Sequence, residues 1–201
     1  MYLSFKRIID FIISLILLVI LSPLFIITAV LIKVDSRGPI IFKQPRIGRK
    51  GKTFKVWKFR TMIDNAESMG GGLTTAEKDP RITNIGNLLR KISIDEIPQL
   101  VNILKGDMSF IGPRPAPVVH LKKYNDYDKI RLKVLPGITG WAQVNGRNKL
   151  TWPERIEKDV WYVRNISFLL DIKILLKTIK VVLLSEGIYS GRNDSKVNRK
   201  K

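Results

Sequence analysis

The chain has 201 residues, the length of one domain, and its 36 Lys and Arg against 17 Asp and Glu give a formal net charge of +19. An excess of this size indicates an anionic partner: a nucleic acid, a lipid surface or a phosphorylated substrate. The absence of Cys and the single His exclude disulfides, a Cys nucleophile, thiolate zinc sites and two-His metal sites. Any metal is therefore expected to be a hard ion held by carboxylates and phosphate oxygens.

The N-terminal hydrophobic segment carries no charged residue from Phe11 to Ile32, a run of 22 residues. A helix of this length is roughly 33 Å long, enough to cross the hydrocarbon core of a bilayer. Ser22 and Pro23 lie in the middle of the run, and Pro removes a backbone hydrogen bond, so we expect a kink there. The two arms are each about 15 Å long. They therefore also fit a hairpin that enters and leaves one leaflet.

Basic residues flank this segment on both sides. Lys6 and Arg7 precede it, and Lys33 and Arg37 follow it, which favours the cytoplasmic side for both ends. Because Pro-kinked spanning helices also occur, the residues alone leave a re-entrant hairpin and a spanning helix open. A cleaved signal peptide is disfavoured, since the apolar run is too long and no small-residue cleavage site follows it.

Residues 39–62 predict a β-hairpin. Two runs of β-branched and aromatic residues, 40–42 and 53–59, are separated by the turn residues 48–51. The hairpin carries eight basic residues and no acid, which fits either a solvated basic face or contact with lipid phosphate worth about 1 kcal/mol per residue. Residues 64–79, with three consecutive glycines, are expected to form a mobile connector or lid.

Helical patterns follow at residues 85–89, 96–104 and 152–164. The last is opened by Thr151, with Glu154 three residues later, the pattern of a capping box. Residues 166–184 are strongly apolar but carry a stripe of three lysines, Lys173, Lys177 and Lys180. This pattern fits either an amphipathic helix at a membrane interface or a core helix with one wet face.

The adjacent carboxylates Asp95 and Glu96 follow Arg90 and precede Pro98. Because Pro is tolerated only in the first turn of a helix, we expect a helix to begin at about Asp95. A carboxylate at that position lies at the positive end of the helix dipole and stays ionised. The competing explanation is structural, since Asp is a favoured N-cap residue and Ser93 with Glu96 matches a capping box.

Two later segments present polar side chains on stiff or tight backbone. Arg114 lies between two prolines, so its planar guanidinium is presented by a stiff loop that suits phosphate, unless the loop is only an exposed polyproline turn. Residues 135–148 are rich in glycine and form either a nucleotide-binding loop pair or two ordinary turns. The candidate nucleotide-binding residues there are Gln143, Asn145 and Arg147.

With these segments in view, the sequence resembles the monotopic phosphoglycosyl transferases, a family of bacterial sugar transferases. The match is close to PglC-like members, those that lack extra N-terminal membrane helices. The motifs that carry it are FKRIID, the apolar run with Ser22 and Pro23, KFRTM, DPRIT, LRKISIDEIPQLVNILKGDMSFIGPRP and RLKVLPGITGWAQVNGRN. Together they cover nearly the whole chain, and the long central string is the specific one.

The resemblance implies transfer of a sugar 1-phosphate from a UDP-sugar to a polyprenyl (undecaprenyl) phosphate, the first membrane step of glycoconjugate synthesis. It implies a covalent phosphosugar intermediate on Asp95, release of UMP, and a requirement for Mg²⁺, with Asp95 as the expected metal contact. By the same resemblance Glu96 completes the catalytic dyad, and Arg90 and Arg114 bind phosphate. The resemblance also favours the re-entrant hairpin over the spanning helix.

We therefore expect an α+β, mainly helical fold at the cytoplasmic face of a bacterial inner membrane. A re-entrant membrane segment, 1–36, precedes a catalytic domain, 37–184, with a small β-hairpin and interfacial amphipathic helices, and a basic, disordered tail, 185–201. The expected partners are a UDP-sugar, polyprenyl phosphate and anionic lipids, without nucleic acid; sugar identity and oligomeric state are left open. The competing hypothesis is a membrane-tethered basic module that binds nucleic acid or anionic lipid without catalysis.

Overall fold

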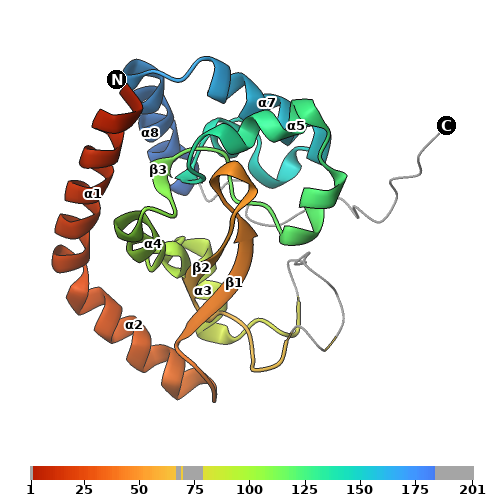
Figure 1. The fold of residues 1–201 in the computed structure, drawn as a ribbon. Coiled ribbons are helices and arrows are strands. Elements are labelled where there is room, and N and C mark those ends of the chain that lie inside the picture. Colours follow the sequence, from red (N-terminus) through yellow and green to blue (C-terminus); the bar gives the residue numbers. More distant parts are fainter. Residues whose placement is uncertain (1, 67–68, 70–78, 184–201) are drawn as a thin grey trace.

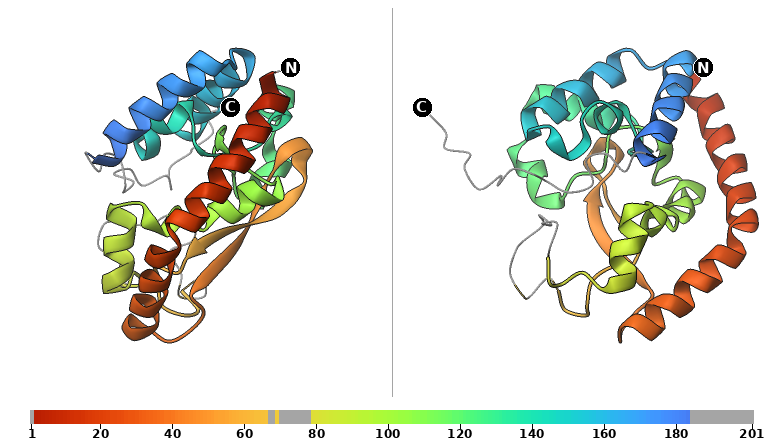
Figure 2. Two further views of the ribbon diagram at one scale, coloured as in Figure 1. Left: turned by 90° about the vertical axis from the view of Figure 1, so that its left-hand side faces the viewer. Right: turned by 180° about the vertical axis from the view of Figure 1, so that it is seen from behind.

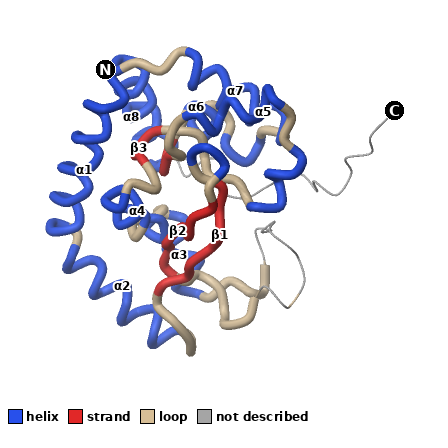
Figure 3. The backbone as a smooth tube through the Cα atoms, viewed as in Figure 1, coloured by secondary structure: helices blue, strands red, loops and turns tan. Residues whose placement is uncertain are grey.

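The computed structural model describes residues 2–66, 69 and 79–183 (Figure 1). The expected tail at 185–201 and most of the expected connector at 64–79 lie outside the described residues. Within them the chain is mainly helical, with two small two-stranded sheets (Figure 3). The mainly helical class and the hairpin predicted from the sequence are confirmed, whereas the second sheet was not predicted.

Helices α1 (Tyr2–Ile20) and α2 (Ser22–Asp35) form an arc along one side of the molecule and are bent by 62° relative to one another (Figure 1). The predicted kink is confirmed, because Pro23 lies in the first turn of α2 and the Ser22 hydroxyl donates to the carbonyl of Val19 at 2.8 Å. Among the described helices no single one is long and apolar enough to cross a membrane. Taken together, the bent pair α1 and α2 has the length and the apolar composition that such a segment needs.

Helix α1 has a polar inner face and an apolar outer face. Its buried residues are Lys6, Asp10 and Ser14, while its outward face exposes large apolar side chains. The inner face packs on α4 (Gln99–Lys105), where Arg7 donates hydrogen bonds to the carbonyls of Ile103 and Leu104 at 2.5 and 3.0 Å. These bonds satisfy carbonyls that the end of a helix leaves without intrahelical partners.

Strands β1 (Ile41–Ile47) and β2 (Thr53–Phe59) form the predicted antiparallel hairpin. Their register places Ile41 opposite Phe59 and Ile47 opposite Thr53. The turn between them contains Lys50 at φ +57°, a left-handed conformation that non-glycine residues seldom adopt.

The second sheet is a short parallel pair, β3 (Ser109–Ile111) and β4 (Gly137–Thr139). The two chains approach closely just beyond β3, because a Cβ on Gly137 would lie 2.1 Å from the backbone nitrogen of Gly112. Only glycine allows this contact. The contact fixes the start of the loop that carries Arg114.

Further helices surround these sheets. They are α3 (Asn84–Lys91), α5 (Asp126–Lys129), α6 (Trp141–Val144), α7 (Trp152–Arg164) and α8 (Phe168–Leu183). Short 3₁₀ helices cover Arg49–Gly51, Ile94–Glu96, Val118–Lys123, Ile130–Lys133 and Arg147–Lys149. The capping box predicted at the start of α7 is confirmed, since Glu154 Oε2 accepts from the Thr151 backbone N–H at 2.6 Å.

The start of helix α8 lies near the start of α1 (Figure 2). Several large apolar side chains of α8 are exposed. Leu169 and Leu176 are largely exposed, whereas Ile174 is fully buried. The ammonium groups of Lys173 and Lys177 lie over the ring of Trp141. The exposed leucines favour the interfacial interpretation of this segment over the core helix.

Candidate active site

The two adjacent carboxylates lie in the 3₁₀ turn Ile94–Glu96, between α3 and α4. The predicted helix start at Asp95 is wrong, because α4 begins only at Gln99. Ser93 adopts φ +58°, so the chain turns sharply after α3, and its side chain caps nothing. The predicted capping box is therefore absent, and the carboxylates are placed by a turn and by ion pairs.

Glu96 is clamped between two cations. Its Oε1 accepts from Lys58 Nζ at 2.6 Å, and Arg114 binds both carboxylate oxygens through its two terminal nitrogens. Burial raises the pKa of Glu96, but Arg114 and Lys58 outweigh that effect and hold the pKa well below its usual range. Glu96 therefore stays ionised and ties β2 to the Arg114 loop.

Asp95 is more loosely partnered than Glu96, although it is only 9% exposed. Its Oδ2 lies 3.9 Å from Lys58 Nζ. Burial raises the pKa of Asp95 above its ordinary value, and the neighbouring charge of Glu96 adds to this, while Lys58, Arg90 and Arg114 act in the opposite direction. Asp95 lies in the 3₁₀ turn before α4 and not in the first turn of a helix, so the expected helix dipole does not act on it in the way predicted. The charged form of this carboxyl is favoured instead by the three nearby cations.

Arg90 reaches the site from α3. Its Nε donates to the Thr61 hydroxyl at 2.8 Å, and its charge lowers the pKa of Asp95. Helix α3 is able to lie this close because a Cβ on Gly86 would be 2.1 Å from the Thr61 carbonyl oxygen. The structure therefore brings Arg90, Arg114 and the dyad together, as predicted.

The three predicted nucleotide-binding residues have different surroundings. Burial and the charge of Arg114 lower the pKa of Arg147, while Glu96 and Asp95 oppose this, so its guanidinium lies near the dyad. Both amide atoms of Gln143 are buried without a hydrogen-bond partner among the described residues. Asn145 is occupied within the fold: its amide donates to the Trp141 carbonyl and accepts from Lys177.

A magnesium ion fits this site only with help from the substrate. The described residues contain no cluster of three or more His, Cys, Asp or Glu that would hold a metal ion by itself. Glu96 is engaged by two cations, which leaves Asp95 as the carboxylate able to contact an ion. Mg²⁺ is commonly held by one or two carboxylates together with substrate phosphates and water, so this donor set is compatible with it.

Comparison with known proteins places this site in a family context. The profile of the family described as bacterial sugar transferase matches residues 1–185. The chain belongs to the bacterial sugar transferase family.

Curated relatives of two lengths support the membership. The sugar transferase EpsL of Bacillus subtilis is 47% identical over 183 residues, which are 91% of this chain and 89% of EpsL. The UDP-glucose:undecaprenyl-phosphate glucose-1-phosphate transferase of Escherichia coli is 40% identical over 194 residues, and the undecaprenyl-phosphate galactose phosphotransferase of Salmonella typhimurium is 42% identical over 198. Each match covers 92% of this chain but 41% of the longer relative.

Lys58 was not identified from the sequence as a site residue of this sugar transferase. It was counted among the eight basic residues of the hairpin, but its ammonium group points at the dyad. Arg60 is also buried and donates to Ser36 at the end of α2, so neither residue belongs to an outer basic face. Strand alternation was the available signal, because Lys58 lies two residues after the buried Val56 and hence on the same face.

Proposed function

We propose that this sugar transferase moves a sugar 1-phosphate from a UDP-sugar to a polyprenyl phosphate of the undecaprenyl type and releases UMP. The names of the Escherichia coli and Salmonella relatives describe such transfers. The observation that carries the proposal is a mostly buried, loosely partnered Asp95 surrounded by the cations Lys58, Arg90 and Arg114. Such a site offers a nucleophile together with charge complementary to a diphosphate.

The proposed reaction has two steps. Asp95 attacks the phosphorus that bears the sugar, the bond to the bridging oxygen of the diphosphate breaks, and UMP leaves with that oxygen. A phosphate oxygen of the lipid then attacks the same phosphorus, which gives the polyprenyl diphosphate sugar and restores the Asp95 carboxylate. Splitting the transfer in this way is the usual advantage of a covalent intermediate.

The surrounding residues have separate proposed roles. Arg114 and Arg90 bind phosphate oxygens and offset the repulsion between Asp95 and the diphosphate, while Glu96 holds Arg114 and Lys58 in place. Mg²⁺, contacted by Asp95 and the diphosphate oxygens, would supply further charge neutralisation. Arg147 is suited to contact the nucleotide, and so is the amide of Gln143, which has no hydrogen-bond partner within the described part of the chain. Asn145 serves the fold.

The proposed location is the cytoplasmic face of a bacterial inner membrane, with α1 and α2 re-entrant in one leaflet. The bend at Ser22 and Pro23, the apolar outer face of α1 and the exposed leucines of α8 support it. A polyprenyl phosphate carries its reactive group at headgroup level, so an enzyme held in the interface meets it there. Anionic lipids would add to the attachment of this basic domain.

A UMP-release assay tests the proposal. The enzyme in detergent is mixed with undecaprenyl phosphate, Mg²⁺ and each of a panel of UDP-sugars. We expect release with at least one sugar, dependent on the lipid phosphate and on Mg²⁺, and lost in Asp95→Asn. Absence of UMP with every sugar, together with strongly salt-dependent DNA binding, would instead support the basic-module hypothesis.

A further inference from the structure

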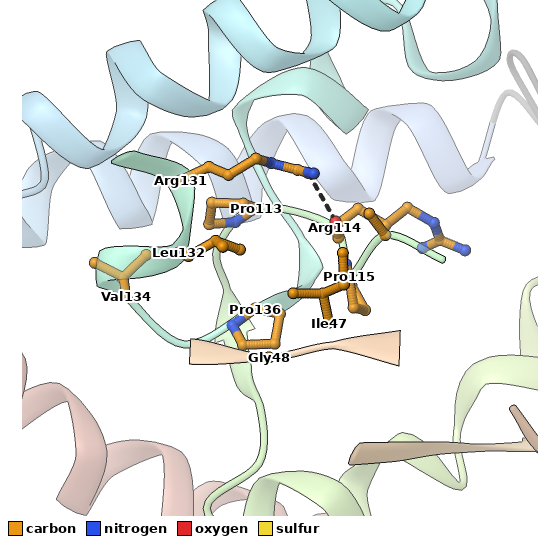
Figure 4. Close-up of a pocket in the computed structure, with 10 residues that line it drawn as sticks. Ile47, Gly48, Pro113, Arg114, Pro115, Arg131, Leu132, Val134 and Pro136 are labelled. Atoms are coloured by element: carbon orange, nitrogen blue, oxygen red, sulfur yellow. Dashed lines mark hydrogen bonds between the residues drawn. The ribbon is translucent and has the colours of Figure 1, made fainter. Parts of the chain in front are cut away.

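The Arg114 loop is held by a buried guanidinium that the proposed chemistry does not use. Arg131 is 4% exposed, and its Nη2 donates a hydrogen bond of 2.9 Å to the backbone carbonyl oxygen of Arg114 (Figure 4). Both residues help to line a small cavity, and the Arg114 side chain points away from it (Figure 4). Arg131 therefore contacts the backbone of Arg114 and not the groups that would meet substrate.

Arg131 is itself fixed by several partners. Its Nε and Nη2 donate to Oδ2 of Asp159 at 3.1 and 2.6 Å, and Asp159 is 2% exposed. Its Nη1 donates to the Tyr124 hydroxyl, and its guanidinium carbon lies 5.4 Å from the centroid of the Trp152 ring. Because a guanidinium carries its donors in a rigid fork, the pairing with Asp159 sets the direction of the bond to Arg114.

The bond from Arg131 differs from the others that hold this loop. The residues that flank Arg114 in the loop are fixed by backbone–backbone hydrogen bonds, which join Gly112 to Thr139, Pro113 to Gly137 and Ala116 to Ile47. The carbonyl of Arg114 is bound by a side chain from a distant part of the chain. Loss of this side chain would free the peptide that carries Arg114, while the sheet contacts on either side of it remain.

We infer that Arg131 and Asp159 are positioning residues for the transferase reaction. The buried pair fixes the peptide of Arg114 and thereby the direction in which the Arg114 guanidinium meets phosphate and Glu96. The inference rests on the role proposed above for Arg114. A shift of about 1 Å in a positioned group costs about 100-fold in rate, so the pair affects catalysis without touching substrate.

Replacing both charges together separates positioning from stability. Arg131→Met with Asp159→Leu leaves no unpaired buried charge, and such replacements of buried ion pairs are often neutral or stabilising. We expect an unchanged or raised thermal midpoint but a kcat/KM for the UDP-sugar lower by about 10- to 100-fold. A folded double variant with wild-type kcat/KM would overturn the inference. Should the double variant not fold, Arg131→Lys keeps the charge but lacks the fork, and the same criterion applies to it.

A matched control comes from the same helix. Val160 follows Asp159 and belongs to the same buried core cluster as Ala116, so Val160→Ala removes packing from that cluster but not the bond to Arg114. We expect it to lower the thermal midpoint and to leave kcat/KM unchanged. An equal loss of kcat/KM in Val160→Ala would mean that any loosening of this core lowers activity, which would also overturn the inference.

A double-mutant cycle with Arg114→Ala completes the test. If the pair acts through Arg114, then the Arg131→Met, Asp159→Leu replacement causes no further loss of kcat/KM once Arg114 is truncated. An equal fold-loss in both backgrounds would overturn the positioning role and leave the proposed function intact. Wild-type activity in Arg114→Ala alone would instead refute the phosphate-binding role of Arg114, so the two failures are distinguishable.

Discussion

At the scale of single residues, Lys58 links the two carboxylates of the site. It is within 2.6 Å of Glu96 and 3.9 Å of Asp95, and its charge favours the ionised form of both. Lys55, three residues earlier on the same strand, is exposed. Lys55 and Lys58 have the same side chain on the same strand, but only Lys58 contacts the carboxylates. Lys55 is therefore a suitable control.

We predict that Lys58→Met lowers kcat/KM by about 10- to 150-fold. The estimate follows from the loss of a charge-assisted hydrogen bond worth about 1.5 to 3 kcal/mol, at 1.36 kcal/mol per factor of ten in rate. Lys55→Met should retain wild-type activity. Equal losses in the two variants, measured as UMP release, would mean that the hairpin lysines act through membrane attachment and not through the dyad.

Glu96→Gln removes the negative charge that Arg114 and Lys58 share. Both cations then lie close together without the carboxylate between them, so we predict that Arg114 leaves its bound position. Because Arg114 loses its charge-assisted hydrogen bonds to Glu96, we predict a fall in kcat/KM of about 10- to 150-fold. A kinetic constant within experimental error of wild type would show that Glu96 is not the group that holds Arg114 for the reaction.

The sequence predicted which residues gather at the site better than how they are held. Asp95, Glu96, Arg90 and Arg114 were expected together from their motifs, and the structure places them so. The helix start was misplaced because Ser93 takes a left-handed conformation that no local rule predicts for a serine. Lys58 was not separated from the other hairpin lysines, because strand alternation places it on the face of Val56 but does not say what that face packs against.

At the scale of elements, the bend between α1 and α2 sets the directions in which the two arms of the N-terminal apolar segment run. Pro23 lacks an N–H for the hydrogen bond that a straight helix would make, and Ser22 caps the carbonyl of Val19. The sequence predicted the bend correctly because its cause is local. The side of the membrane on which each arm ends depends on the bilayer and remains part of the proposal.

Cysteine labelling tests the re-entrant arrangement, and the chain is suited to it because it contains no native Cys. Ser4→Cys and Lys122→Cys both lie at exposed positions. Ser4 is at the start of α1, before the uncharged run that begins at Phe11, and Lys122 lies after that run. We predict that a membrane-impermeant reagent labels both from the same face. Ser22→Ala with Pro23→Ala restores the backbone donor, straightens the pair and moves the Ser4→Cys thiol to the opposite face. Labelling from opposite faces without these substitutions would contradict the hairpin.

At the scale of the whole molecule, a buried polar cluster attaches the N-terminal helix α1 to α7 and α8. Asp171 of α8 accepts hydrogen bonds from Tyr2 and Lys6 of α1 at 2.5 and 2.7 Å, and from Tyr162 of α7 at 2.8 Å. Tyr2 and Lys6 of α1 are each more than 160 positions away from Asp171 along the chain. Such long-range polar contacts, like that between Arg131 and Arg114, could not be predicted because they depend on packing between distant segments.

Asp171→Ala removes one partner of the buried pair with Lys6 and leaves the ammonium group without its counter-charge. Breaking a buried ion pair in this way costs about 3 to 5 kcal/mol, so we predict a clearly lower thermal midpoint in detergent. Lys33→Gln, which removes an exposed charge from α2, should leave the midpoint unchanged. Equal midpoints for Asp171→Ala and wild type would show that the cluster contributes little to attachment.

The central claim is that Asp95 forms a covalent bond to the sugar-bearing phosphate. Intact-protein mass spectrometry after mixing with UDP-sugar and Mg²⁺, without lipid acceptor, tests it directly. We predict a mass increase equal to one phosphosugar, lost when undecaprenyl phosphate is added and absent in Asp95→Asn. An adduct of undiminished yield in Asp95→Asn would contradict the account.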